Sequence, residues 1–161
     1  MQLFILDHSP AAAAQMLCDV HLRKMCLETA QILSGTAFLQ GKKLPESMPG
    51  IYNPAHPVIK AINTPFKVNW TIDHFSALHR EYFHRFGKTH AFTPLVPLYH
   101  DLLYANDPGE PQWDFARAFK NFSTDIPDIV QAYRAYYRHK KTLIKRWSYT
   151  NSKEPVWLTS R

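Results

Sequence analysis

The chain has 161 residues, of which 45% are hydrophobic and 20% charged, and 19 Lys and Arg outnumber 13 Asp and Glu to give a net charge of +6. This length and composition are typical of one soluble globular domain, and no apolar run reaches the ~18 residues that a membrane-spanning helix requires. The N-terminal sequence MQLFILDHSP has no positive flank and no long apolar stretch, which argues against a signal peptide. We therefore expect a cytoplasmic protein, and its basic charge favours a polyanionic partner such as nucleic acid.

The first predicted elements are a short apolar segment and a long helix. Residues 3–7 form an apolar run that is either a strand or a buried lead-in. Ser9 and Pro10 are typical of a helix N-cap followed by proline at the first helical position. We expect this helix to run from residue 10 to residue 34 and to end near Gly35, because glycine favours helix ends.

The rest of the chain is also predicted to be mainly helical. The composition of residues 36–56 predicts a loop, and residues 114–122 are ambiguous between helix and extended chain. The C-terminal tail is expected to be extended and to pack Trp157 on the core. The clearest helix spans residues 65–86, ends at Gly87, and is expected to expose most of its polar residues. Further helices are predicted at residues 56–63, 94–105 and 127–147. The fold class is therefore mainly α, a compact single-domain helical fold of about four to five helices with a short N-terminal extended segment.

The first long helix carries a polar stripe beside an apolar face. At 100° per residue, the polar side chains fall within about a quarter-turn. They are His21, Lys24, Glu28 and Gln31. The common interpretation is the solvated side of an amphipathic helix. The alternative is a site that holds a base, an acid and an amine, since a carboxylate beside a cation can act as general base or stabilise a cationic intermediate.

The sequence gives no sign of a metal or cofactor. One His and one Glu two turns apart do not match a known ligand spacing, and two cysteines without a C-x-x-C pair give no zinc signal. If Cys18 and Cys26 share a helix, they lie ~12 Å apart along its axis, too far for a disulfide. We therefore expect reduced cysteines, no metal and no cofactor.

The last predicted helix is strongly basic and contains no acid between Asp128 and Glu154. Basic side chains supply phosphate contacts, and the interleaved tyrosines can stack on bases. Alternatively, the aromatic residues are core and the basic residues are the solvated face. The pattern favours a surface that faces DNA or RNA. The expected contacts in this helix are Arg134, Arg138, Lys140, Lys141 and Lys145.

Three positions elsewhere are candidates for the same surface. His56 stands at a predicted helix start, where backbone N–H groups favour anions, although it can equally be a capping histidine. Arg85 and Lys88 lie near the end of the helix over residues 65–86 and are expected to join the basic surface.

Several segments together resemble the phage pyrimidine-dimer DNA glycosylases of the endonuclease V type. DVHLRKMCLE resembles the signature helix of that family, in which an acidic residue precedes a His-Leu pair and a Glu follows the His by seven residues. The matching residues are Asp19, His21, Leu22 and Glu28. NPAHP resembles a His-Pro segment of bacterial relatives, ALHREYFHRFGKTH resembles a later helix, and AYRAYYRHKKTLIKRW is similar to the basic tail of related phage proteins.

The resemblance implies a single DNA-glycosylase-like helical domain over residues 1–161 and a base-excision reaction. In the family, an amine attacks the sugar C1′ of a damaged pyrimidine nucleotide and forms a Schiff base, which the signature glutamate supports through strand cleavage. Glu28 is then the catalytic carboxylate, and His21 is a site or DNA-contact residue. Arg23 and Lys24 are the nearest cations, with Arg23 an expected DNA contact. The implied partner is double-stranded DNA, bent or with a flipped nucleotide. The protein is expected to be a monomer with no membrane partner, and to act in the host cytoplasm if the chain is phage-encoded.

The chain departs from the family pattern at two positions. The family nucleophile is the α-amine exposed after removal of the initiator Met, but the bulk of Gln2 should leave Met1 in place. Leu27 stands where the family has an arginine before the glutamate. Three alternatives follow. The amine is that of Met1; or it is Lys24, if partial desolvation beside a carboxylate lowers its pKa enough for attack; or the chain is not a lyase.

Two other functions remain open at this point. One is a phage DNA base-modification transferase on the same scaffold, because fold alone does not determine function. The other is a non-enzymatic nucleic-acid-binding protein. The enzyme interpretation makes a geometric prediction: His21, Lys24 and Glu28 should line an open concavity that faces the same side as the basic last helix.

Overall fold

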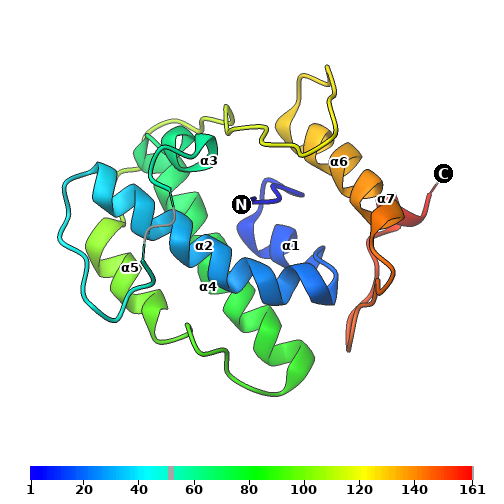
Figure 1. The fold of residues 1–161 in the computed structure, drawn as a ribbon, viewed down its shortest axis with the longest axis horizontal. Coiled ribbons are helices and arrows are strands. Elements are labelled where there is room, and N and C mark those ends of the chain that lie inside the picture. The colour runs from blue at the N-terminus through cyan, green and yellow to red at the C-terminus, as the bar shows by residue number, and fades with distance from the viewer. Residues whose placement is uncertain (51–52, 161) are drawn as a thin grey trace.

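The structure is a computed structural model that describes residues 1–50 and 53–160, and no strand occurs among them (Figure 1). The predicted mainly helical class is confirmed, although there are more helices than the four to five expected, because two short ones were not anticipated. The helices are α1 (Pro10–Gln15), α2 (Asp19–Leu39), α3 (Pro57–Ala61), α4 (Pro65–Phe86), α5 (Leu95–Leu103), α6 (Ile129–Leu143) and α7 (Val156–Thr159). None of these helices is long and apolar enough to cross a bilayer.

The predicted helix over residues 10–34 is two helices, because the chain breaks between Gln15 and Asp19. Cys18 has an extended backbone, with φ −68° and ψ 161°, and acts as the N-cap of α2. Tertiary contacts satisfy the backbone groups freed by the break: the Cys18 amide donates to the Tyr137 hydroxyl, and the Gln15 carbonyl accepts from Arg85. Sequence periodicity alone does not reveal partners so distant in the chain.

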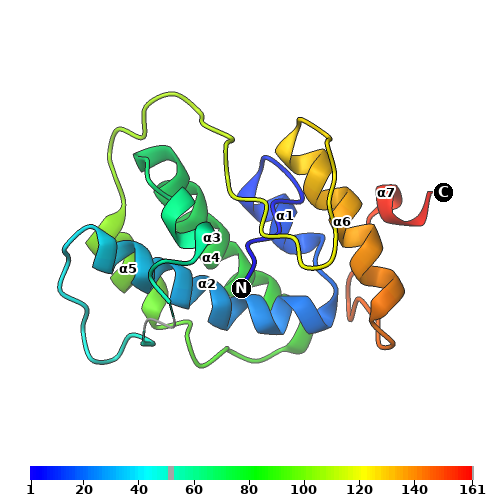
Figure 2. The same ribbon diagram turned by 45° about the horizontal axis from the view of Figure 1, so that its top comes forward.

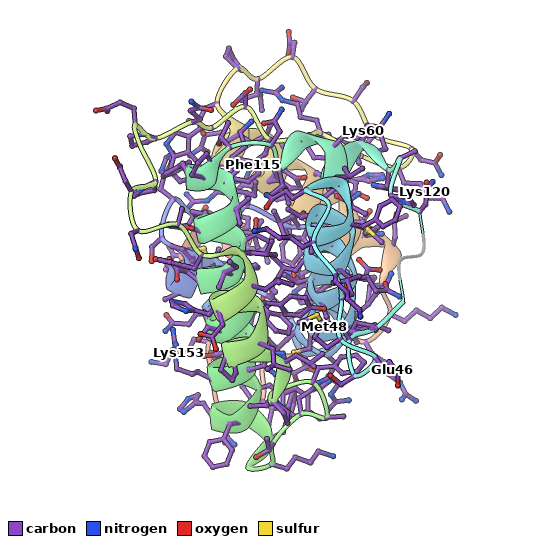
Figure 3. The ribbon with its side chains drawn as sticks, turned by 90° about the vertical axis from the view of Figure 1, so that its left-hand side faces the viewer. Glu46, Met48, Lys60, Phe115, Lys120 and Lys153 are labelled. Atoms are coloured by element: carbon purple, nitrogen blue, oxygen red, sulfur yellow. The ribbon has the colours of Figure 1, made fainter. Side chains whose placement is uncertain are left out.

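Helices α2 and α4 form the centre of the fold, with α1 packed against α4 (Figure 2). Side chains fill the space between α2 and α4 (Figure 3). The apolar face predicted for α2 is buried, and it comprises Cys18, Leu22, Met25, Cys26, Thr29, Ile32 and Leu33. Residues 3–6 are a buried lead-in rather than a strand. This segment brings the N-terminus against α2.

Helix α4 is more buried than we expected from the number of polar residues in its sequence. Its bounds are as predicted, and Gly87 ends it with φ 64° in the left-handed region. However, its second face packs on the α1 region, where Trp70 Nε1 donates to the His8 carbonyl and His74 Nδ1 contacts the Pro10 carbonyl. Asn69 is also buried and bonds both backbone groups of Ala105. The expectation that most polar residues of this helix are exposed is therefore wrong for this face.

Helix α2 continues through Gly35, where α3 approaches it closely. A Cβ built on Gly35 would lie 2.6 Å from Cδ1 of Ile59 and 3.0 Å from its Cγ2. Glycine at this position therefore serves close helix packing rather than helix termination. The contact holds α3, and with it His56 at the N-cap of α3, beside α2.

We expect Gly35→Ala to lower the free energy of unfolding by about 1 kcal/mol. Overpacking against Ile59 is worth ~1–3 kcal/mol, and the gain in helix propensity of ~1 kcal/mol offsets part of it. Chemical denaturation measures the change, and Ile59→Val in the same chain should recover part of the loss. A Gly35→Ala protein more stable than the parent would contradict the close approach of α2 and α3.

The C-terminal third wraps over the first turns of α2. The ambiguous segment of residues 114–122 is irregular, and its backbone bonds the Tyr133 and Tyr136 hydroxyls of α6. Helix α6 is shorter than the predicted 127–147, and the tail expected to be extended contains the short helix α7. Trp157 packs against the hydrophobic core, as predicted.

Candidate active site

The Glu28 carboxylate lies between the N-terminal backbone and a lysine. The amide of Gln2 donates to Oε2 of Glu28 at 3.0 Å, and Lys24 Nζ lies 3.1 Å from Oε1. Glu28 is 9% exposed, whereas the Lys24 side chain is 61% exposed. The N-terminal segment is held in turn by Gln2 Nε2, which donates to the Ala118 carbonyl. The buried lead-in thus delivers the first two residues of the chain to the polar stripe of α2.

A cavity of about 340 Å³ opens at this place, lined by Met1, Glu28, Gln31 and His56. His56 Nδ1 accepts from the Val58 amide at 3.2 Å, so the capping interpretation of this histidine is confirmed. Burial lowers the pKa of His56, the charge of the N-terminal amine lowers it further, and Glu28 acts in the opposite sense. An amine, a carboxylate and an imidazole therefore interact around one cavity.

His21 does not line this cavity, although it lies on the same face of α2 as Glu28. Its ring is 4% exposed and packs on Phe4 and Trp147, and its Nδ1 lies 2.9 Å from the Tyr137 hydroxyl. Helix α6 and the chain after it cover the first turns of α2, whereas the cavity opens at the later turns. Of the three residues expected to line one open concavity, only Glu28 lines this cavity, so the expectation is wrong for His21 and for Lys24.

The decisive comparison concerns the first 94 residues. The family model described as pyrimidine dimer DNA glycosylase matches residues 1–94. The chain belongs to this family. Comparisons with curated proteins and with solved structures find no match.

The family match contains every residue that lines the cavity around Glu28. It also contains α1 to α4, whose packing brings the N-terminus, α2 and α3 together. The match ends before α5, so the resemblance seen in the basic last helix lies outside it and stays a prediction. A pyrimidine-dimer DNA glycosylase-like role, with DNA as substrate, follows for the matched part of the chain.

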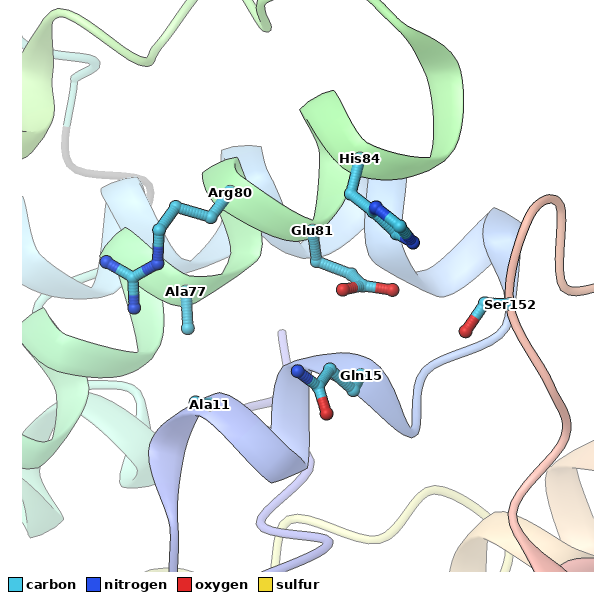
Figure 4. A pocket seen from close by; sticks show the side chains of 7 residues that line it. All are labelled: Ala11, Gln15, Ala77, Arg80, Glu81, His84 and Ser152. Atoms are coloured by element: carbon cyan, nitrogen blue, oxygen red, sulfur yellow. The ribbon is translucent and has the colours of Figure 1, made fainter.

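Arg85 cannot act as a DNA contact in this family member, because its side chain is fully buried. Nε donates to Glu81 at 2.7 Å, Nη1 donates to the Leu17 carbonyl and to Asp19, and Nη2 donates to the Gln15 carbonyl. The cation fills the break between α1 and α2. Near it, Glu81 points from α4 toward Gln15 across a polar cavity (Figure 4).

Asp19, the acidic residue of the signature helix, also has a structural position. It accepts hydrogen bonds from Arg85, from the Ser148 hydroxyl, and from the amide and hydroxyl of Thr150. Burial raises the pKa of Asp19, but these hydrogen bonds outweigh burial and lower it below the usual value. The charged carboxylate fastens the C-terminal segment to the start of α2.

Three cations of α6 bind other segments of the chain. Arg134 donates to the Leu6 carbonyl and Asp7, and Arg138 donates to the Trp157 carbonyl. Lys141 Nζ pairs with Glu154 at 2.6 Å. These three side chains hold the N-terminal segment and the tail, whereas Lys140 of α6 is half-buried and Lys145, two residues after α6, is exposed.

Two cations outside α6 also remain accessible. Lys88 is exposed just beyond the end of α4. Arg23 is exposed on α2, and its guanidinium lies 4.3 Å from the centre of the Phe86 ring.

The sequence offered Met1 as a possible amine and residues 3–7 as a possible buried lead-in, but it did not show that this segment brings Met1 beside Glu28 and His56. Tyr137 was grouped with stacking aromatics, yet its hydroxyl accepts from the Cys18 amide and contacts His21. Its position one helical turn from Tyr133 was the available signal for a core role.

We expect stability to fall as the pH drops from about 6.5 toward about 4. Burial lowers the pKa of His21 to about 3 and those of His74 and His79 to about 4. In this window the unfolded histidines bind protons and the folded ones do not, so each contributes a slope of at most ~1.4 kcal/mol per pH unit. Urea unfolding at several pH values measures the slope. The exposed His100 supplies a control, since its replacement by Ala should leave the slope unchanged; a flat profile above pH ~5 would refute the expectation.

Proposed function

We propose that this protein is a DNA glycosylase with abasic-lyase activity on a damaged or flipped pyrimidine nucleotide. The observation that carries the proposal is the convergence of the Met1 α-amine, Glu28 and His56 on one cavity inside the family match. A nucleotide within a duplex must leave the stack before its sugar C1′ can reach such a cavity. The cavity volume of about 340 Å³ falls in the range of small-ligand sites.

In the proposed reaction, the neutral Met1 amine attacks C1′ of the nucleotide. The bond between C1′ and the base nitrogen breaks, the base leaves with the bonding pair, and opening of the sugar ring gives an imine between C1′ and the amine. Glu28 stabilises the protonated imine electrostatically and accepts a proton from C2′. The electron pair of that C–H bond then expels the 3′ phosphate, which cuts the strand.

The Met1 amine suits this role better than Lys24. Met1 is half-buried and lines the cavity, whereas Lys24 Nζ is paired with Glu28 Oε1 on a largely exposed side chain. In this proposal Lys24 orients the Glu28 carboxylate and contacts DNA.

The proposed DNA-binding surface surrounds the cavity rather than following α6. Lys24 is exposed on α2, Lys60 is exposed on α3 four residues after His56, and Lys120 follows the segment that binds Gln2. Figure 3 shows Lys60 and Lys120 on the same flank of the molecule and Lys153 on the opposite flank. This arrangement supports a phosphate-binding rim at the cavity.

We expect Lys60→Ala and Lys120→Ala each to reduce the salt slope of DNA affinity by about 1, because each removes one phosphate contact. The measurement is the dissociation constant for a short duplex over a series of salt concentrations. Lys153→Ala is the matched control and should leave the slope unchanged. Equal effects of all three changes would place the DNA elsewhere.

Cleavage of three duplexes tests the proposed function. One contains a cyclobutane pyrimidine dimer, one an abasic site and one no damage. The proposal predicts cleavage at the dimer and at the abasic site, with no cleavage of undamaged DNA. Binding without any cleavage would support a non-enzymatic protein, and mass added to a base, with the strand intact, would support the transferase; either result would overturn the proposal.

A further inference from the structure

A second cluster of reactive side chains lies on nearly the opposite face of α2 from Glu28. Cys26 on α2, His79 on α4 and His90 in the segment between α4 and α5 bring together three ligand atoms within 4.8 Å of one another. These atoms are the Cys26 sulfur and one ring nitrogen from each histidine. The proposed lyase reaction uses none of them.

His79 presents an unpaired nitrogen in this cluster. Its Nδ1 lies 2.9 Å from the Thr93 hydroxyl, whereas its Nε2 is buried and makes no hydrogen bond. An imidazole that donates Nδ1–H to a neighbour keeps its lone pair on Nε2, which is the usual arrangement of a metal-binding histidine. Buried polar atoms without a partner are uncommon in proteins, so the Nε2 atom calls for an explanation.

The charges of the cluster are compatible with a cation. Burial, and then the charge of His90, lowers the pKa of His79 to about 4, and burial also lowers the pKa of His90, so both rings are neutral near pH 7. Burial raises the pKa of the Cys26 thiol to about 12. A bound divalent ion would stabilise the thiolate.

We propose that Cys26, His79 and His90 bind one borderline-soft divalent ion, with Zn²⁺ the best match to one sulfur and two nitrogen ligands. Binding forms a bond from sulfur to the metal, releases the thiol proton to solvent, and leaves the fourth tetrahedral position for water. Tetrahedral zinc holds its ligand atoms about 3.5 Å apart, so the cluster must contract by about 1 Å. His90 Nδ1 accepts from the Phe92 amide at 3.1 Å, so a neutral His90 ring must give up this hydrogen bond to bind the ion through either nitrogen.

An access route and a consequence follow from the surroundings. His79 and Thr93 also line a cavity of about 460 Å³ that reaches Phe83 and Val96, through which an ion and its water can enter. The bound ion would join α2, α4 and the segment that leads into α5. Because Cys26 and Glu28 point to nearly opposite sides of α2, this site stabilises the scaffold and is independent of the proposed reaction.

The test uses the untagged full chain, stripped of metal with a chelator. Titration with Zn²⁺ against a chromophoric chelator should give one ion and one released proton per chain, with a raised Tm. Co²⁺ should give a thiolate charge-transfer band. Cys26→Ala and His90→Ala should each weaken binding by more than about 100-fold, since even partners of the ligands are worth ~10–100-fold. Cys18→Ala and His100→Ala are the matched controls and should bind normally.

Other outcomes would overturn the site. These are the absence of binding at micromolar Zn²⁺, the absence of a thiolate band with Co²⁺, and unchanged affinity in His90→Ala. Because His90 is half-buried and outside any helix, this variant decides the question even if Cys26→Ala fails to fold. Glu28→Gln should bind Zn²⁺ normally; loss of binding there would place the ion at the Met1 cavity instead.

Discussion

Replacing Glu28 by Gln is expected to lower strand cleavage at an abasic site by about 10²- to 10⁴-fold, with little change in DNA affinity. The amide is nearly isosteric and can still accept from the Gln2 amide, so the N-terminal segment keeps its position. It has no negative charge to stabilise the protonated imine and cannot accept the C2′ proton. Single-turnover cleavage of an abasic duplex, with affinity measured separately, gives both quantities.

Two comparisons make the Glu28 result specific. Glu46→Gln changes an exposed acid in the loop after α2 and should leave the cleavage rate unchanged (Figure 3). Lys24→Gln removes the ion pair but keeps the carboxylate, and should reduce cleavage less than Glu28→Gln does. Cleavage by Glu28→Gln within about threefold of the parent would remove this residue from the chemistry.

Arg85→Met is expected to have the largest effect on stability, a loss of about 3–5 kcal/mol in the free energy of unfolding. The change leaves the carboxylates of Asp19 and Glu81 without their buried cation. It also leaves the Gln15 and Leu17 carbonyls without a donor at the break between α1 and α2. Methionine fills similar space, so the loss reports the missing charge and hydrogen bonds rather than a cavity.

Arg80→Met provides the control for this measurement. Arg80 lies on the same helix, is exposed, and donates only to the Ser76 hydroxyl among the described residues (Figure 4). It should change stability by less than about 0.5 kcal/mol. Urea denaturation of both variants at pH 7 measures the two values, and a loss below about 1 kcal/mol for Arg85→Met would show that the buried network is dispensable.

Local sequence signals predicted most of the helices but not the break in the first one. Pro57, Pro65 and Gly87 mark helix ends by their own backbone restrictions. Helix α4 begins and ends as expected, whereas α3 begins at Pro57 but ends at Ala61, two residues before the predicted end. The break at Cys18 depends instead on hydrogen-bond partners from α4 and α6, which are far away in the sequence. The contact between Gly35 and Ile59 of α3 also joins segments that are separate in the sequence. Without it, Gly35 was expected to end the helix, whereas it lies within α2 and leaves room for α3.

The site was predictable where one helix carries it and not where segments meet. The spacing along α2 singled out Glu28, and the resemblance gave it a catalytic role that stays a prediction; the family model matches the segment that contains this residue. The same spacing put His21 in the site, because a helical wheel cannot show that α6 covers only the early turns. Arg85 illustrates a third case: a basic residue near a helix end was expected at the surface, but two buried carboxylates hold it in the core.

Trapping of the imine with borohydride tests the central claim most directly. The parent protein is incubated with an abasic duplex, the adduct is reduced and digested, and the modified peptide is sequenced by mass spectrometry. The proposal predicts one adduct, on the α-amine of Met1, whose yield falls in Glu28→Gln and persists in Lys24→Gln. An adduct on Lys24, or binding of the duplex without any adduct, would contradict it.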